Sequence, residues 1–203
     1  MDARTKIVGV ALAGGASRRM GRDKAALRWS GSTLLERTVE RLAAVCAEVV
    51  VADRGRGLLA DTGTVSVDDG PGGGPAAGIL GAATAHPGRD LLVLACDLPR
   101  VPASLLSAIA ALGGGADWVV PAWGEPERLE PLCALYRPAA LAALAGRVDR
   151  GRYALHRLIE APGLAVRRLG REALEAHGRP AEMFLNVNAP EDFAVLRGGA
   201  AAR

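Results

Sequence analysis

Residues 12–24 read Leu-Ala-Gly-Gly-Ala-Ser-Arg-Arg-Met-Gly-Arg-Asp-Lys, and they overlap the end of the apolar run Ile7–Leu12. The apolar run predicts a buried strand that leads into Gly14 and Gly15. Paired glycines after a strand let backbone N–H groups turn toward a ligand, and such arrangements bind anions. The stretch therefore predicts a strand followed by an anion-binding loop.

Four cations lie in the nine residues after Gly15, namely Arg18, Arg19, Arg22 and Lys24. Several positive charges at one place indicate a ligand with several negative charges, such as a polyphosphate. The chain has only two lysines, Lys6 and Lys24, against a large excess of arginine. A lysine kept here indicates a need for a compact, hydrated point charge. The alternative interpretation of these residues is a solvated basic turn.

The spacing of this loop differs from that of a Walker A motif. That motif has Gly, four residues and then Gly-Lys-Ser/Thr, whereas Lys24 follows Asp23 and precedes Ala25. This difference excludes a P-loop ATPase.

Apolar periodicity predicts alternating strands and helices along the chain. Apolar positions at three- and four-residue spacing predict a helix over Thr33–Cys46, and Thr33-Leu34-Leu35-Glu36 forms a capping box at its start. Further strands are predicted at Val49–Val51 (a central strand), Thr64–Val67, Leu91–Ala95, Trp118–Val120, Leu132–Tyr136, Leu164–Arg168 and Phe184–Asn188. Further helices are predicted at Pro75–Ala85, Pro102–Leu112, Ala139–Leu144, Tyr153–Ile159 and from Pro190 onward, with a polar loop at Gly124–Arg128.

This alternation predicts βαβ units and a parallel sheet over the first 112 residues. We expect a Rossmann-like, three-layer α/β/α fold with a mostly parallel central sheet. We expect one domain over residues 1–196, with a nucleotide-binding half to about 112, an acceptor-binding half from about 113, and a frayed tail at 197–203.

Composition narrows the class of protein. The 203 residues are 50% hydrophobic but only 3% aromatic, so Ala, Leu and Val must fill the core. Because no apolar run approaches about 18 residues, we expect no membrane partner. The N-terminus leads directly into a strand without signal-peptide organisation, which predicts a cytoplasmic protein. Cys46, Cys96 and Cys133 lie in apolar segments and are expected to be buried and free in a reducing compartment.

A net charge of +3 favours an anionic partner. No long basic run or set of stacking aromatics is present, so a phosphorylated small molecule is expected rather than nucleic acid. His86, His156 and His177 are scattered, and we expect no histidine metal site.

Acidic residues follow two of the predicted strands. Asp97 comes directly after Leu91–Ala95 and Cys96, and Asp68 and Asp69 follow Thr64–Val67. Ligands of open α/β sheets bind at the carboxyl ends of the strands, so these acids are expected near the glycine loop. Asp97 suits Mg²⁺, which is held in phosphate chemistry by one or two carboxylates and substrate oxygens. Asp68 or Asp69 supplies a second carboxylate or contacts a base or ribose. The alternatives are a helix cap at Asp97 and a simple turn at Asp68 and Asp69.

Residues 72–77 also match the pattern G-x-G-x-x-A of dinucleotide-binding loops. However, the glycines follow two aspartates rather than a strand, and Pro75 lies inside the match. A nicotinamide-dependent oxidoreductase is therefore the least favoured interpretation.

Five segments in this order resemble the molybdenum cofactor guanylyltransferases, a family of nucleotidyltransferases. They are residues 12–24, Gly74–Ile79 (Gly-Pro-Ala-Ala-Gly-Ile), Cys96–Pro99 (Cys-Asp-Leu-Pro), Glu130–Tyr136 (Glu-Pro-Leu-Cys-Ala-Leu-Tyr) and Asn186–Asp192 (Asn-Val-Asn-Ala-Pro-Glu-Asp). The resemblance implies transfer of GMP from GTP to molybdenum-bound molybdopterin, with release of pyrophosphate and with Mg²⁺ as cofactor. It also implies transient contacts with proteins that deliver or accept the cofactor, and we expect a monomer.

The resemblance assigns roles to individual residues. Lys24, Asp97 and Arg19 are the implied catalytic residues, with Arg18 as an alternative to Arg19. The nucleotide would be held by Leu12, Ala13, Gly14, Gly15, Lys24, Asp68 and Asp97, the metal by Asp97, and the pterin side or the metal site by Asn186 and Asn188.

Two positions depart from the family pattern. Ala52 stands where the family often carries Asn near the nucleotide, and Ala189 stands where it carries Thr in the closing motif. Loss of a polar contact weakens discrimination between bases. A related transferase that uses CTP or another phosphorylated acceptor is therefore an open alternative, as is a non-catalytic nucleotide-binding protein.

Overall fold

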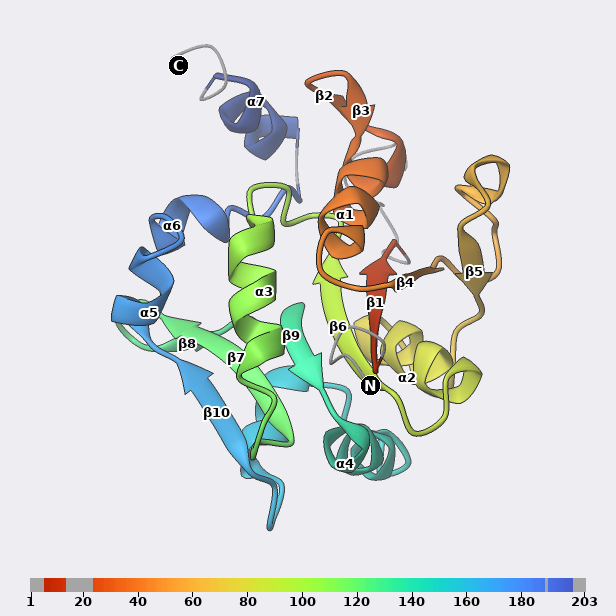
Figure 1. Cartoon of the computed structure of the whole chain (residues 1–203), viewed down its shortest axis with the longest axis vertical. Helices are drawn as coiled ribbons and strands as arrows, with labels where there is room; N and C mark the ends of the chain where they lie inside the picture. The colour runs from red at the N-terminus through yellow and green to blue at the C-terminus, as the bar shows by residue number, and fades with distance from the viewer. Residues whose placement is uncertain (1–5, 14–23, 189, 199–203) are drawn as a thin grey trace.

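A mixed sheet runs through the residues described by the computed structural model, 6–13, 24–188 and 190–198 (Figure 1). Within these residues its seven-strand path has the order β10-β7-β9-β6-β1-β4-β5, and an eighth strand, β8, pairs with β7. The strands are β1 (Ile7–Leu12), β4 (Glu48–Ala52), β5 (Val65–Val67), β6 (Asp90–Ala95), β7 (Trp118–Trp123), β8 (Arg128–Leu129), β9 (Cys133–Tyr136) and β10 (Val166–Leu169). A separate hairpin joins β2 (Arg28–Trp29) and β3 (Ser32–Thr33).

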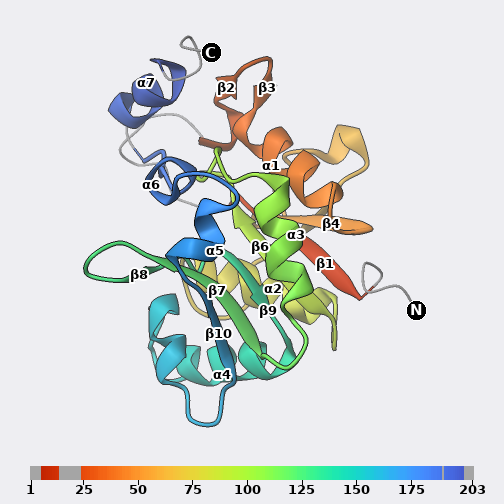
Figure 2. The ribbon, with the colours of Figure 1, turned by 60° about the vertical axis from the view of Figure 1, so that its left-hand side comes forward.

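Helices cover both faces of the sheet (Figures 1 and 2). They are α1 (Leu34–Ala43), α2 (Pro75–Ala85), α3 (Ala103–Ala111), α4 (Pro138–Val148), α5 (Arg171–Glu175), α6 (Pro180–Met183) and α7 (Pro190–Gly198). Short 3₁₀ turns lie at η2 (Lys24–Ala26), η3 (Ala60–Thr62) and η4 (Leu155–Glu160). None of the helices in this described part of the chain has the length and apolar character that a membrane span needs.

Alternation along the strands divides the core into two layers. Ile7 and Ala11 of β1 pack toward α1 and α3, whereas Val8 and Val10 pack toward α2 and α4. Successive side chains of a strand point to opposite faces, so a strand that is apolar at every position is buried on both sides. The expected three-layer α/β/α architecture is confirmed.

The sheet is mostly parallel where the nucleotide-binding half was predicted. β1 pairs in parallel with both β4 and β6, and β4 pairs in parallel with β5. In the second half, β9 lies antiparallel between β6 and β7. The carboxyl ends of β1, β4 and β6 therefore meet at one edge of the sheet.

A third, small hydrophobic cluster packs helix α7 and the segment before it against the start of α1. Leu34, Val187 and Leu196 are buried together, with Trp29 and Phe193 packed against them. Both views place α7 beside β2 and β3 (Figures 1 and 2). The cluster thus holds the segment before α7 over the start of α1, close to the carboxyl edge of the sheet.

Several predicted elements are confirmed in place. β1 and α2 have the predicted bounds, and the capping box at the start of α1 forms, with Thr33 N–H donating to Glu36 over 2.6 Å and Glu36 N–H donating to Thr33 over 3.1 Å. The three cysteines are buried and free. β4 is an inner strand that pairs with β1 on one side and β5 on the other, as predicted for Val49–Val51.

Other predictions are wrong for identifiable reasons. The predicted strand at Phe184–Asn188 is irregular, since Val187 N–H donates to the Asp97 carbonyl in a loop rather than to a strand. The predicted helix at Tyr153–Ile159 is the 3₁₀ turn η4, and α7 continues to Gly198 beyond the predicted start of the tail.

Gly81 sets the distance between α2 and the segment that carries Asp68 and Asp69. A Cβ at Gly81 would lie 1.9 Å from the Asp68 carbonyl oxygen and 2.8 Å from the Gly70 backbone nitrogen. These are backbone atoms, and Gly70 N–H donates to the Ala77 carbonyl of α2 over 2.8 Å. A side chain at this position must therefore push the acidic loop away from the helix.

We predict that Gly81→Ala lowers the free energy of unfolding by about 1–3 kcal/mol, because overpacking forces backbone shifts. Gly146→Ala is the matched control, since Gly146 also lies inside a helix but a Cβ there would meet only side-chain atoms of Arg150, at 3.6 Å or more. That substitution is expected to stabilise by about 0.5–1 kcal/mol. Urea unfolding of both variants measures the difference, and equal effects would contradict the close approach at Gly81.

Candidate functional site

A cavity of about 310 Å³ opens where β1, β4 and β6 end. It is lined by Leu12, Ala13, Lys24, Ala52, Arg54, Asp69, Gly74, Pro75, Gly78, Ala95, Cys96, Asp97 and Leu132. The last residue of each of these three strands lies in the lining, so the parallel sheet itself forms the floor. Polar groups converge at two places, one around Lys24 and Asp97 and one around Arg54 and Asp69.

Lys24 and Asp97 form the first polar end. The Lys24 Nζ lies 4.0 Å from Asp97 Oδ2, and the two side chains are 17% and 20% exposed. Asp97 Oδ1 is buried and accepts no hydrogen bond from the described residues. Burial raises the pKa of the Asp97 carboxyl, and the nearby Lys24 ammonium opposes this rise. A carboxylate with an unsatisfied buried oxygen is suited to a cation.

The closing motif meets this end from a distant part of the chain. The Lys24 Nζ donates to Asn188 Oδ1 over 2.5 Å, and Val187 N–H donates to the Asp97 carbonyl over 2.9 Å. Asn186 Oδ1 is buried and has no hydrogen-bond partner among the described residues. Neither asparagine lines the cavity itself. The structure thus brings Lys24, Asp97 and Asn188 together, with Asn186 two residues away.

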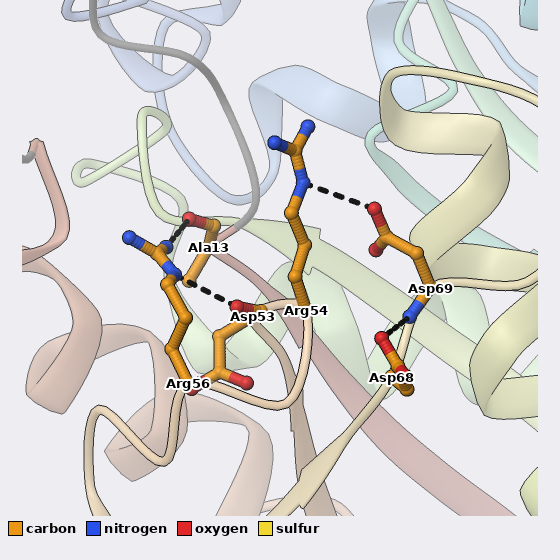
Figure 3. Close-up of polar contacts among 6 residues, drawn as sticks. All are labelled: Ala13, Asp53, Arg54, Arg56, Asp68 and Asp69. Carbon is orange, nitrogen blue, oxygen red and sulfur yellow. Dashed lines mark hydrogen bonds and ion pairs between the residues drawn. The ribbon is translucent and has the colours of Figure 1, made fainter.

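Arg54 and Asp69 form the second polar end (Figure 3). Arg54 Nε donates to Asp69 Oδ2 over 3.0 Å, and the side chains are 47% and 24% exposed. Asp68 points elsewhere: its side chain is exposed and accepts a hydrogen bond from Asp69 N–H over 2.8 Å. The sequence left Asp68 and Asp69 as alternatives, and the geometry places Asp69 in the cavity.

The loop after β4 is built around the buried Asp53 (Figure 3). Its side chain is 0% exposed and accepts hydrogen bonds from Leu58 N–H over 2.8 Å and from the Ser66 hydroxyl. Arg56 donates through Nε to the Asp53 carbonyl over 2.8 Å and through Nη2 to the Ala13 carbonyl over 3.0 Å. Ala13 N–H donates to the Ala52 carbonyl over 3.0 Å. Arg56 therefore ties this loop to the chain just where β1 leads into residues 14–23.

Glu130 is a further half-buried acid, located between β8 and β9. It accepts a hydrogen bond from Trp123 Nε1 over 2.9 Å. Burial raises the pKa of the Glu130 carboxyl, the Trp123 hydrogen bond and the Arg128 guanidinium oppose this rise, and the Asp97 carboxylate adds to it. Glu130 and Asp97 are thus close enough to interact electrostatically.

Part of the predicted site lies outside the described residues. Gly14, Gly15, Arg18 and Arg19 belong to this part. Sequence reasoning missed Arg54, Arg56 and Glu130. A signal existed for the arginines, because Asp53–Gly57 reads Asp-Arg-Gly-Arg-Gly directly after a strand, which is typical of a turn that presents charged side chains.

The side chains around Asp97 indicate what kind of metal ion the site could bind. The described residues hold no group of three or more His, Cys, Asp or Glu side chains that could bind a metal ion. Asp97 nevertheless offers a buried oxygen to which none of the described residues donates a hydrogen bond. This arrangement fits an ion of the Mg²⁺ type, which takes one or two carboxylates and completes its shell with water and substrate phosphates.

The sequence pattern of the MobA-like NTP transferase domain matches residues 9–169. The chain belongs to the MobA-like NTP transferase family. A probable molybdenum cofactor guanylyltransferase of Chloroflexus aggregans is 34% identical over 194 residues, which cover 93% of this chain and 92% of that protein. This family membership makes the chain a nucleotidyltransferase and displaces the oxidoreductase and non-catalytic interpretations.

Two solved structures share this fold. Molybdopterin-guanine dinucleotide biosynthesis protein A of Archaeoglobus fulgidus superposes with a TM-score of 0.80 at 23% identity, covering 97% of this chain and 100% of that one. A Mycobacterium tuberculosis protein in complex with manganese superposes with a TM-score of 0.66 at 20% identity, covering 96% of this chain and 99% of that one. MobA-like NTP transferases of this kind generally use a divalent metal ion, in keeping with the donor set at Asp97.

We predict that Asp53→Asn lowers the free energy of unfolding by about 1–3 kcal/mol, because an amide cannot accept through its NH₂ group and leaves one donor unpaired. Asp61→Asn, at an exposed position of η3, is the control and is expected to be neutral. Chemical unfolding of the two variants measures the difference. An Asp53→Asn protein as stable as the wild type would contradict the role of the buried carboxylate.

We predict that Glu130→Gln raises the free energy of unfolding at about pH 7 and leaves it unchanged below about pH 4.5. The folded state holds the Glu130 proton more tightly than the unfolded chain does. The Glu130 carboxyl therefore lowers the free energy of unfolding as the pH rises above the ordinary pKa of a glutamate. Gln keeps the acceptor for Trp123 without the charge. Unfolding is measured across this pH range without divalent ions, with exposed Glu172→Gln as control, and a pH-independent difference would contradict the prediction.

Proposed function

We propose that this chain transfers GMP from GTP to the terminal phosphate of molybdenum-bound molybdopterin and releases pyrophosphate. The observation that carries the proposal is the pairing of Lys24 with Asp97, whose Oδ1 accepts no hydrogen bond from the described residues, at one end of a cavity at the strand ends. A cation beside a metal-binding carboxylate suits a bound polyphosphate. The curated relative named above supplies the choice of GTP and of the acceptor.

The chemistry is an in-line displacement at the α-phosphorus. An oxygen of the acceptor phosphate forms a bond to this phosphorus, and the bond to the β-phosphate oxygen breaks, so pyrophosphate leaves with the electron pair. The acceptor phosphate is already an anion at neutral pH, so no strong general base is required. The protein contributes alignment and charge neutralisation.

Lys24 is the cation placed to meet the triphosphate. Its ammonium lies between Asp97 and Asn188, which hold it by charge and by a hydrogen bond. From this position it offsets negative charge that develops on the leaving pyrophosphate. Arg19, and the backbone N–H groups of Gly14 and Gly15, are proposed to complete the phosphate site from the neighbouring loop.

Asp97 is proposed to hold Mg²⁺ through Oδ1, which has no hydrogen-bond donor within the part of the chain that the structure describes. When bound, the ion offsets charge on the phosphate oxygens and helps to orient them. Asn186 and Asn188 are proposed to face the acceptor, because their segment closes over Asp97 through the Val187 hydrogen bond. A monomer that contacts cofactor-delivering and cofactor-accepting proteins transiently is sufficient for this reaction.

Asp97→Asn tests the proposal, because the amide keeps the shape of the side chain but loses its charge. We expect pyrophosphate release with GTP, Mg²⁺ and loaded molybdopterin to fall by about 100- to 1000-fold. GTP binding measured without divalent ions should change little, and Asp61→Asn should match the wild type. Near wild-type turnover by Asp97→Asn would remove the metal assignment, and turnover with CTP in place of GTP would reassign the substrate.

A further inference from the structure

Arg54 adopts a backbone conformation that residues other than glycine rarely adopt. Its φ is +66°, in the left-handed region, and the residue is followed by Gly55 at +67°. Such a conformation costs about 1 kcal/mol or more, so it persists only where the surroundings impose it. Here the buried Asp53 carboxylate and the two Arg56 hydrogen bonds fix the turn. The result is a guanidinium held over the cavity and paired with Asp69 (Figure 3).

The two polar ends of the cavity suit different parts of a nucleotide. Lys24 and Asp97 suit phosphates and their metal ion, which leaves the Arg54 end for the base. Two small lining residues, Ala52 and Gly78, lie close to Asp69, since a Cβ at Gly78 would be 3.8 Å from Asp69 Oδ1. A Cβ at Gly78 would lie 3.1 Å from Leu12 Cδ2 and 3.2 Å from Ala52 Cβ. Helix α2 therefore packs so closely on the ends of β1 and β4 that a side chain at position 78 would be crowded. Small apolar residues leave room for a flat ring.

We propose that Arg54 is a specificity-determining residue that donates a hydrogen bond to O6 of guanine while Asp69 accepts from N1–H and N2–H. This inference rests on the proposed function and names the residue that selects its nucleotide. Ala52, at the position where the sequence departs from the family, offers no polar side chain. The arginine two residues later supplies the donor that this position lacks.

The existing ion pair does not need to break for this recognition. A guanidinium has five N–H donors, and the contact with Asp69 uses only the one on Nε. The Nη groups lie beyond Nε in Figure 3 and extend away from Asp69. A carboxylate can accept about four hydrogen bonds. Asp69 can therefore hold Arg54 and accept from a base at the same time, which keeps the arginine oriented for O6.

Other bases mismatch this pair of groups. Adenine has an amino group in place of O6 and an acceptor at N1, which would face a donor and a carboxylate respectively. Cytosine places an acceptor at N3 beside its amino group, so one acceptor faces the Asp69 carboxylate. Unpaired or opposed polar groups in such a site give large discrimination between ligands. The pair therefore selects a ring that carries a keto group beside an N–H.

The test compares Arg54→Gly with the wild type in binding GTP, ITP, ATP and CTP, measured by calorimetry without acceptor. Glycine accepts the left-handed backbone without strain, so the fold is preserved and thermal unfolding verifies this. Arg171→Ala is the matched control, because it removes an Nε–carboxylate pair of 2.7 Å with Glu175 on the exposed surface. Arg54→Lys keeps the positive charge and serves as the conservative variant.

We expect Arg54→Gly to weaken binding of GTP and ITP by about 10- to 100-fold and to change ATP and CTP by less than about 3-fold. The wild type should bind ITP less tightly than GTP, because inosine lacks the 2-amino donor to Asp69, and Arg54→Lys should recover part of the loss. Equal weakening of all four nucleotides would show that Arg54 contacts the phosphates. An unchanged preference for GTP over the other nucleotides would show that Arg54 does not contact the base. Either result overturns the inference while leaving the proposed function intact. A wild type without preference for GTP would instead overturn both.

Discussion

The carboxylate of Asp97, two residues after the end of strand β6, is the group on which the site depends. One of its oxygens accepts no hydrogen bond from the described residues, and the other lies 4.0 Å from a single ammonium. Burial disfavours the charge, and one lysine at that distance offsets the cost only partly. A group in this state gains most when a divalent ion and phosphates arrive. In the mechanism we propose, the unfavourable electrostatics around the Asp97 carboxylate favour the binding of a divalent ion.

The order of the strands decides which residues surround this carboxylate. β1 lies between β4 and β6, so three parallel strands end side by side and deliver Ala52, Ala13 and Cys96 to one edge. The C-terminal segment reaches the same edge through the small cluster of Leu34, Val187 and Leu196. This cluster places Asn188 on Lys24 across 164 residues of sequence. The surroundings of Lys24 and Asp97 therefore depend on packing at the far end of the chain as much as on the sheet.

A second buried carboxylate, Asp53, has the opposite character. Its carboxylate accepts hydrogen bonds from Leu58 N–H and the Ser66 hydroxyl, and its backbone carbonyl accepts one from Arg56. A satisfied buried acid of this kind rigidifies its surroundings rather than binding a ligand. It holds Arg54 in a left-handed conformation and Arg56 on the Ala13 carbonyl, so one loop shapes both the base end of the cavity and the exit of β1.

The sequence by itself determined the elements whose signals are local. The apolar run at Ile7–Leu12, the capping box at Thr33 and the proline that opens α2 act through neighbouring residues, and they formed as predicted. The order of motifs also placed Lys24 and Asp97 at one site, because the carboxyl ends of parallel strands meet at one edge of a sheet. Only the tertiary structure placed Asp69 rather than Asp68 in the lining of the cavity and made Phe184–Asn188 a loop. Those outcomes depend on which distant backbone atoms are available for pairing, and on close approaches such as that of Gly81 to Asp68, which no local pattern encodes.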